Sequence, residues 1–214
     1  MMHAYNHYYL EDVMNNFGAM FDCVANVVHY DLSVFYDMFL ASGVDLQIEM
    51  GNPRYLSGLS GAELMKIVFE KCSDRIIHNV DYKLSERGRE YWIGWALAYY
   101  QWYTAKPFSY LKRNGLDIKT LISLYPTMHE ADLFKFVDTA NSIIECHIAN
   151  TPNILKTLRK QLHITQNQLA ELSGVSLRMI QAYEQGDQDI RKAEAKTVFA
   201  LSKTLRCPAE LIIE

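Results

Sequence analysis

Apolar residues recur at spacings of three and four along most of the chain, which is the pattern of amphipathic helices. One run extends over residues 10–24, and a second follows Asp31 and ends before Gly43. Ser60 and Glu63 form the pattern of a capping box ahead of a third run. We therefore expect the N-terminal two thirds of the chain to be helical.

Two further helices are expected before residue 150. Thr127 and Glu130 repeat the capping-box pattern ahead of an apolar series over residues 133–148. Pro126 lacks the N–H that a helix interior needs. We therefore predict that it ends the preceding helix, over residues 118–125.

Residues 43–50 are ambiguous, because Val44, Leu46, Ile48 and Met50 alternate with polar residues as they do in a strand. A strand needs a partner, and the sequence offers no second convincing one. We favour a helix or irregular chain here, with a strand as the alternative.

The segment YWIGWALAYYQWY, residues 91–103, is apolar almost all round. A membrane-spanning helix needs about 20 such residues, whereas this run has 13 and contains Gln101. We expect it to be the central helix of an N-terminal domain, in which buried Trp and Tyr side chains need partners for their N–H and O–H groups. An aromatic-lined ligand pocket is the alternative.

The stretch TQNQLAELSGVSLRMIQAYEQG, residues 165–186, has the pattern of a helix, a tight turn and a second helix. Thr165 can cap the first helix, with Gln168 completing a capping box. Gly174 stands where the helix end needs a left-handed residue, which glycine adopts without steric penalty. Ser176 then caps the second helix.

The second helix is predicted to have a buried and an exposed face. Met179, Ile180 and Tyr183 share one face at spacings of three and four. The opposite face carries Leu177, Arg178, Gln181, Ala182 and Gln185. One Arg and two Gln can hydrogen-bond base edges in a major groove, and the apolar Leu and Ala can touch thymine methyl groups.

These residues resemble the Xre or lambda-repressor type of helix-turn-helix, and the resemblance extends over residues 153–214. NILKTLRKQLHIT resembles the first helix of that family, with Leu155, Leu158 and Leu162 facing inward and Lys156, Arg159 and Lys160 facing outward. AKTVFALSKTLRCPAELI resembles its fourth helix and its closing short helix. The resemblance implies an all-α chain, with a helical domain over residues 1–149 and a five-helix DNA-binding domain over residues 151–214.

The resemblance also implies where DNA binds. In that family the start of the first motif helix meets the DNA backbone, and the second helix meets bases. The implied site residues are Thr165, Gln166, Asn167, Ser176, Leu177, Arg178, Gln181, Ala182 and Gln185. The implied partner is double-stranded DNA with a palindromic operator, bound by a homodimer. The alternative is a small helical bundle whose polar face is only solvated.

Charge divides the chain unevenly, within a net charge of −4. From Thr151 onward nine Lys and Arg stand against seven Asp and Glu, a net +2; residues 1–150 hold twelve against eighteen, a net −6. The acidic part is unsuited to phosphates, whereas the C-terminal part can approach them. Because +2 is modest, one copy should bind weakly, and two copies on a two-fold site should bind better.

No pattern for an enzyme, a metal site or a cofactor stands out. Glycine-rich phosphate loops are absent, and His129-Glu130 lacks the second His of a zinc-protease motif. The four cysteines are far apart and form no CxxC pair: Cys23, Cys72, Cys146 and Cys207. We therefore expect reduced, buried thiols in an intracellular, cytoplasmic protein. The first residues lack the pattern of a secretory signal, and no membrane partner is expected.

The N-terminal segments FYDMFLASG, GNPRYLSGLSGAEL and YWIGWALAYYQWY resemble the leading region of a group of bacterial Xre-type proteins, some of which neighbour toxin-like genes. Two functions stay open. The first is a transcriptional regulator whose N-terminal domain dimerises the protein or senses a signal. The second is an antitoxin, whose acidic, aromatic-rich N-terminal domain neutralises a partner toxin while the C-terminal domain autoregulates the operon.

Overall fold

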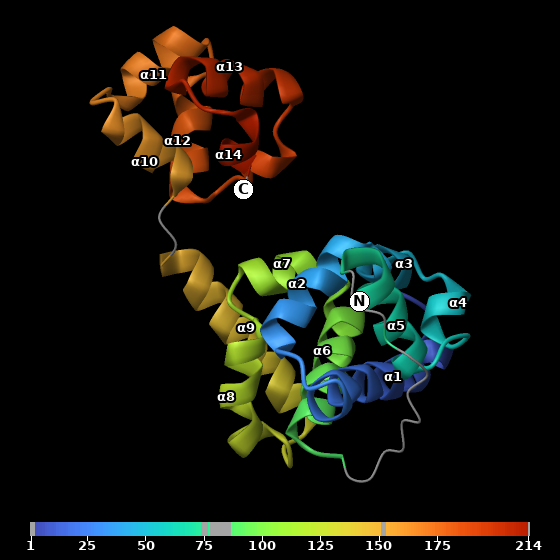
Figure 1. The fold of residues 1–214 in the computed structure, drawn as a ribbon. Coiled ribbons are helices and arrows are strands. Elements are labelled where there is room, and N and C mark those ends of the chain that lie inside the picture. The colour runs from blue at the N-terminus through green and yellow to red at the C-terminus, as the bar shows by residue number, and fades with distance from the viewer. Residues whose placement is uncertain (1–2, 74–76, 78–86, 151–152, 214) are drawn as a thin grey trace. The chain divides into compact units, whose positions relative to one another are not determined.

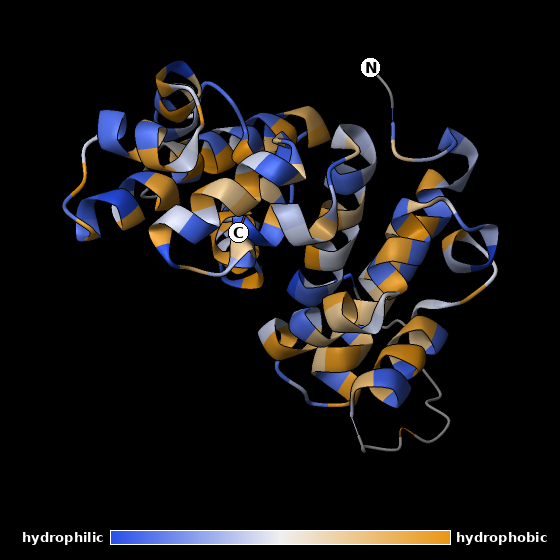
Figure 2. Cartoon of the chain, turned by 90° about the horizontal axis from the view of Figure 1, so that it is seen from above, coloured by the Kyte–Doolittle hydropathy of each residue, from blue (hydrophilic) through white to orange (hydrophobic). Residues whose placement is uncertain are grey.

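The computed structural model describes residues 3–73, 77, 87–150 and 153–213, and all regular structure within these ranges is helical (Figure 1). The all-α prediction is confirmed. The chain divides into two compact units, Met1–Ala149 and Asn150–Glu214, which we name the N-terminal unit and the C-terminal unit. Hydrophobic residues run along the helices in stripes bordered by hydrophilic ones (Figure 2), as the sequence spacing predicts.

The N-terminal unit begins with a 3₁₀ turn, His7–Tyr9, and α1 continues into a π-helical turn, Cys23–Val27. Its helices are α1 (Leu10–Asp22), α2 (Leu32–Ser42), α3 (Val44–Glu49), α4 (Pro53–Leu56), α5 (Gly61–Cys72), α6 (Arg89–Thr104), α7 (Phe108–Arg113), α8 (Ile118–Met128) and α9 (Leu133–Asn150).

The prediction of a central aromatic helix is confirmed by α6, most of whose side chains are buried. Several of its polar aromatic groups have hydrogen-bond partners. The indole N–H of Trp102 donates to the carbonyl oxygen of Tyr5 (2.9 Å), and the hydroxyl of Tyr100 donates to Oδ1 of Asn141 (2.6 Å). These bonds tie the N-terminal segment and α9 to α6.

Two glycines let α1 and α6 pack closely side by side (Figure 1). A Cβ on Gly94 would lie 2.3 Å from the carbonyl oxygen of Phe17, and a Cβ on Gly18 would lie 2.6 Å from Cζ of Tyr91. Both distances are shorter than a van der Waals contact. A side chain at position 94 would therefore push the two backbones apart, whereas one at position 18 would displace the ring of Tyr91.

Local start and stop signals in the first half of the unit are confirmed. Gly43 ends α2 in the left-handed conformation (φ 72°). The ambiguous segment 43–50 then forms a helix, α3, rather than a strand. Ser60 and Glu63 form the predicted capping box, in which Glu63 Oε2 accepts from the N–H of Ser60 (2.8 Å).

The predicted junction of α8 and α9 is wrong in two respects. Pro126 lies inside α8, which continues past it because a proline in the last turns removes only one hydrogen bond. Thr127 does not cap α9; its hydroxyl donates to the carbonyl oxygen of Leu124 (3.1 Å), as a threonine within a helix can. The cap is Asp132, whose Oδ1 accepts from the N–H of Phe134 (2.7 Å).

The C-terminal unit consists of α10 (Ile154–Gln161), α11 (Gln166–Ser173), α12 (Leu177–Gln185), a 3₁₀ turn (Ile190–Lys192), α13 (Ala195–Leu205) and α14 (Ala209–Ile213). Its core is small and consists of Leu155, Leu169, Ile180, Tyr183, Leu201, Leu205 and Ile212.

One expectation about the first helix of this unit is wrong. Leu162 does not face inward; it is exposed, because it follows the last turn of α10. Thr151 and Pro152, which have the sequence pattern of a helix start, lie outside the described residues. Within the described part α10 begins after Asn153, whose Oδ1 accepts from the N–H of Lys156 (3.0 Å).

All four cysteines are free thiols. Cys23 is buried, whereas Cys146 is exposed, because the last turns of α9 are open to solvent. The prediction of buried thiols is therefore wrong for Cys146.

Among the described residues, no helix combines the length and the apolar composition that spanning a membrane requires.

Candidate nucleic-acid interface

The motif of α11, turn and α12 is built from the local signals that the sequence predicts. The side chain of Thr165 accepts from the N–H of Gln168 (3.1 Å), and Gln168 Oε1 accepts from the N–H of Thr165 (2.8 Å). Gly174 ends α11 in the left-handed conformation (φ 71°). Ser176 caps α12 by accepting from the N–H of Met179 (3.3 Å). The two helices are thereby separated by a three-residue turn.

The two faces of α12 differ in exposure as the spacing predicts. Ile180 and Tyr183 are buried in the core of the unit. Arg178 and Gln185 are exposed on the opposite face. The other predicted base-reading positions lie beside them: Ser176 is exposed, and Leu177, Gln181 and Ala182 are half-buried.

Three residues at the start of α11 are predicted to contact the DNA backbone, and they differ in exposure. Thr165 and Asn167 are exposed, while Gln166 is half-buried. Nε2 of Gln166 donates to Oε2 of Glu184 (2.8 Å), near the end of α12. Gln166 therefore ties the start of α11 to α12, and one of its two amide hydrogens is already used.

A buried ion pair joins α10 to α12. Nε and Nη2 of Arg159 donate to the two carboxylate oxygens of Glu184 (2.6 and 2.9 Å), and Nη1 donates to the carbonyl oxygen of Ile164 (2.8 Å). The side chains are 11% and 2% exposed. This paired geometry is the strong form of the Arg–carboxylate interaction. The expectation that Arg159 faces outward is therefore wrong.

The pKa of Glu184 reports how completely it is paired. Burial alone would raise this pKa, but the hydrogen bonds from Arg159 and Gln166 outweigh burial and hold it below its ordinary value. The same bond to Glu184 raises the pKa of Arg159. Glu184 thus stays ionised, and α10, α11 and α12 meet at one carboxylate.

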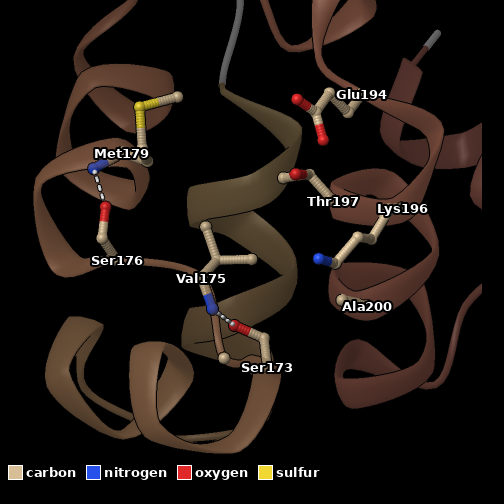
Figure 3. Close-up of a pocket in the computed structure, with 9 residues that line it drawn as sticks. Ser173, Val175, Ser176, Met179, Glu194, Lys196, Thr197 and Ala200 are labelled. Atoms are coloured by element: carbon tan, nitrogen blue, oxygen red, sulfur yellow. Dashed lines mark hydrogen bonds between the residues drawn. The ribbon is translucent and has the colours of Figure 1, made fainter.

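A pocket of about 230 Å³ opens between the turn and the start of α13 (Figure 3). It is lined by Ser173, Gly174, Val175, Ser176, Met179, Glu194, Lys196, Thr197 and Ala200. The side chains of Lys196, Thr197 and Glu194 point across it toward Val175 and Met179 (Figure 3). The N-terminal ends of α12 and α13 therefore border one hollow.

Sequence reasoning missed Glu184 and Lys196. Glu184 follows Ile180 by one helical turn, so its spacing places it near the buried face, but its partner Arg159 lies 25 residues earlier. Lys196 lines the pocket next to α12 only because α13 packs beside the turn.

The described residues offer no group of three or more His, Cys, Asp or Glu placed to hold a metal ion. The polar groups around α12 are hydrogen-bond donors and acceptors on rigid helices. Such a surface can recognise a ligand by hydrogen bonds and charge.

Comparison with known protein families places residues 155–212 in a helix-turn-helix family model. The match covers α10 to α14 almost completely. The C-terminal unit is thus a helix-turn-helix domain. The resemblance of the N-terminal segments to a group of Xre-type proteins finds no support. Comparisons of the chain with curated proteins and with solved structures gave no match.

Proposed function

We propose that the protein is a sequence-specific, DNA-binding transcriptional regulator in which α12 enters the major groove. The observation that carries this proposal is the arrangement of α12 within a helix-turn-helix domain: Arg178 and Gln185 are exposed, opposite the buried Ile180 and Tyr183. Arg pairs well with guanine and Gln with adenine in the major groove.

The rigid support of α12 favours base reading. Arg159 and Gln166 both bond Glu184, so the base-reading helix is held by α10 and α11. A side chain on such a support loses less conformational entropy on binding than one on a mobile loop.

Phosphate contacts are assigned to the N-terminal ends of the two neighbouring helices, α11 and α13. Thr165, Gln166 and Asn167 start α11, and Lys196 borders the hollow next to Ser176. Their donors would fix the register of α12 without reading sequence. Glu194 lines the same hollow and would repel a phosphate there.

The modest charge of the C-terminal part favours a dimer. Residues 151–214 carry nine basic and seven acidic residues. Two copies on a palindromic operator would double the number of phosphate contacts, to which affinity responds steeply.

Selection of bound sites from a random DNA pool by the full-length protein tests this function. We expect a palindrome whose half-sites lie about one helical turn, or a multiple of it, apart. Arg178→Ala should lose the preference at one position of each half-site, whereas Lys203→Ala, which removes an equal charge at the far end of α13, should select the wild-type site. No enriched site, or the same site with Arg178→Ala, would contradict the proposal.

A second function, an antitoxin, is favoured by the aromatic residues that the acidic N-terminal unit exposes. Tyr8 is 88% and Phe134 is 61% exposed, and exposed aromatic side chains suit the centres of protein interfaces. Co-expression with the product of the neighbouring gene tests it. Rescue of growth and co-purification in a fixed ratio would support it, and growth arrest despite co-expression would exclude it.

A further inference from the structure

A chain of ring contacts crosses the N-terminal unit and joins three segments. Phe134 of α9 meets Tyr103 of α6 edge-on (centroids 6.2 Å apart), and Tyr103 meets His3 (5.8 Å). His3 stacks on Trp102 (3.8 Å), which meets His7 (5.6 Å). We call these five side chains, together with Tyr8 next to His7 in the chain, the aromatic stripe.

The two ends of the aromatic stripe are open to solvent. Phe134 is 61% exposed at one end, His7 is exposed at the other, and Tyr8 beside it is 88% exposed. Trp102 in the middle is buried and held by its bond to Tyr5. The stripe is therefore a supported row of rings, and rigid aromatic side chains contribute strongly to interfaces because they lose little entropy on binding.

The charges beside the stripe are mainly negative. Asp132 caps α9 two residues before Phe134, and Glu11 and Asp12 are exposed in the first turn of α1, directly after the 3₁₀ turn. Burial raises the pKa of Tyr99, which packs on Tyr103, and the negative charge of Asp132 raises it further. Lys135 is an exposed cation next to Phe134. Residues 1–150 as a whole carry a net −6.

The negative charge around the aromatic stripe favours some binding partners over others. A nucleic acid would stack on aromatic rings, but the acidic unit repels phosphates. A second copy would bring the same negative charge against the first. A cationic protein segment meets both features, because Lys and Arg bind the faces of aromatic rings and are attracted by the flanking carboxylates.

We infer that the aromatic stripe is the docking surface for a cationic, partly apolar segment of a partner protein. This inference rests on the protein-binding function proposed second, and it is independent of DNA binding by the C-terminal unit.

The test uses the full-length protein and a random 12-residue peptide library displayed on phage. The strongest selected peptide is then synthesised and titrated against Tyr8→Ser and Phe134→Ser, with Val34→Ser as control. Val34 is an apolar residue of α2 that is also exposed (47%) and is not part of the stripe. Tryptophan fluorescence confirms that each variant is folded, since all three tryptophans lie in α6.

We expect peptides with a net positive charge, whose affinity falls at least tenfold with each stripe variant and less than twofold with Val34→Ser. Binding should also weaken with added salt. Peptides that bind all variants equally would overturn the inference but leave the protein-binding function standing. A library that yields no binder would overturn both. If Phe134→Ser instead converts a dimer into a monomer in sedimentation, a second copy occupies the stripe and the inference is wrong.

Discussion

The two units reach a stable core by different means. In the N-terminal unit, fully buried aromatic side chains pack around α6, and α1 approaches it through Gly18 and Gly94. The described core of the C-terminal unit has seven buried apolar residues. A bidentate ion pair joins α10 to α12, and a hydrogen bond from Gln166 to the same carboxylate adds α11. The larger unit is held together mainly by close packing of apolar side chains, and the smaller one also depends on a network of buried polar groups.

Their buried carboxylates show the same difference. Asp45 of α3 is 4% exposed, and its Oδ1 is buried without a hydrogen-bond partner. Burial raises the pKa of Asp45 despite backbone hydrogen bonds, and burial together with the charge of Asp45 raises the pKa of Glu49. Glu184 is equally buried, but its partners lower its pKa. Ionisation of the buried Asp45 therefore destabilises the N-terminal unit, whereas the ionised Glu184 holds helices of the C-terminal unit together.

The largest expected effect comes from breaking the ion pair. Arg159→Ala should destabilise the C-terminal unit by about 3–5 kcal/mol, because it leaves the charge of Glu184 buried and unpaired. Lys160→Ala, at the exposed neighbouring position, should have little effect. Circular dichroism in urea should show early loss of part of the helix signal, while tryptophan fluorescence, which reports α6 alone, stays unchanged.

A double variant sharpens that result. Arg159→Met combined with Glu184→Leu removes both charges and should recover most of the lost stability. If the double variant is no more stable than Arg159→Ala, lost packing rather than the unpaired charge explains the loss.

In the N-terminal unit, an added side-chain atom at a close helix contact should lower the free energy of unfolding. Gly94→Ala places a Cβ against the backbone of Phe17, and we expect a loss of about 1–3 kcal/mol. Gly88→Ala is the matched control, because the nearest atom to its Cβ would be Glu90 Oε2 at 3.8 Å. The tryptophan-detected urea transition measures both; equal transitions for the two variants would refute the close-packing account.

The two units should respond to pH in opposite directions. A raised pKa means that Asp45 contributes stability at low pH that is lost as pH rises through that pKa. A lowered pKa means that Glu184 contributes stability above about 4.5 that is lost as pH falls through its own pKa.

Urea unfolding between about pH 3 and pH 8 measures this difference. Asp45→Asn should flatten the pH dependence of the N-terminal unit and stabilise it by about 1 kcal/mol at neutral pH. Asp12→Asn, at an exposed position, is the control. A wild-type N-terminal unit that grows steadily more stable towards pH 8 would contradict the account of Asp45.

The smallest expected effect concerns the pocket beside α12. Lys196→Ala should weaken binding to all DNA sequences alike and reduce the salt slope by about 1, as expected for a single phosphate contact. Glu194→Gln should strengthen binding slightly. Lys203→Ala should leave the slope unchanged, and a slope that also stays unchanged for Lys196→Ala would remove Lys196 from the interface.

Local signals carried most of what the sequence predicted. The caps at Thr165 and Ser176 and the left-handed turn at Gly174 depend on neighbours within a few residues, so the pattern alone places them. The same logic failed at Thr127, where a hydroxyl can bond its own helix as well as cap the next one. Local signals compete, and tertiary packing decides between them.

Long-range partners account for what was missed. The burial of Glu184 requires Arg159, which belongs to a different helix, and no spacing rule connects the two. The role of Lys196 likewise depends on where α13 packs. The exposed face of α12 could be predicted because it depends only on helical periodicity.

Base-resolved binding by Arg178→Ala tests the central claim most directly. The full-length variant is titrated with the selected operator, with each single-base substitution of it, and with random DNA. We predict a loss of about 1–3 kcal/mol that depends on one base pair in each half-site, with binding to random DNA little changed. An equal loss on specific and random DNA would show that Arg178 contacts phosphate, and that α12 does not read bases as proposed.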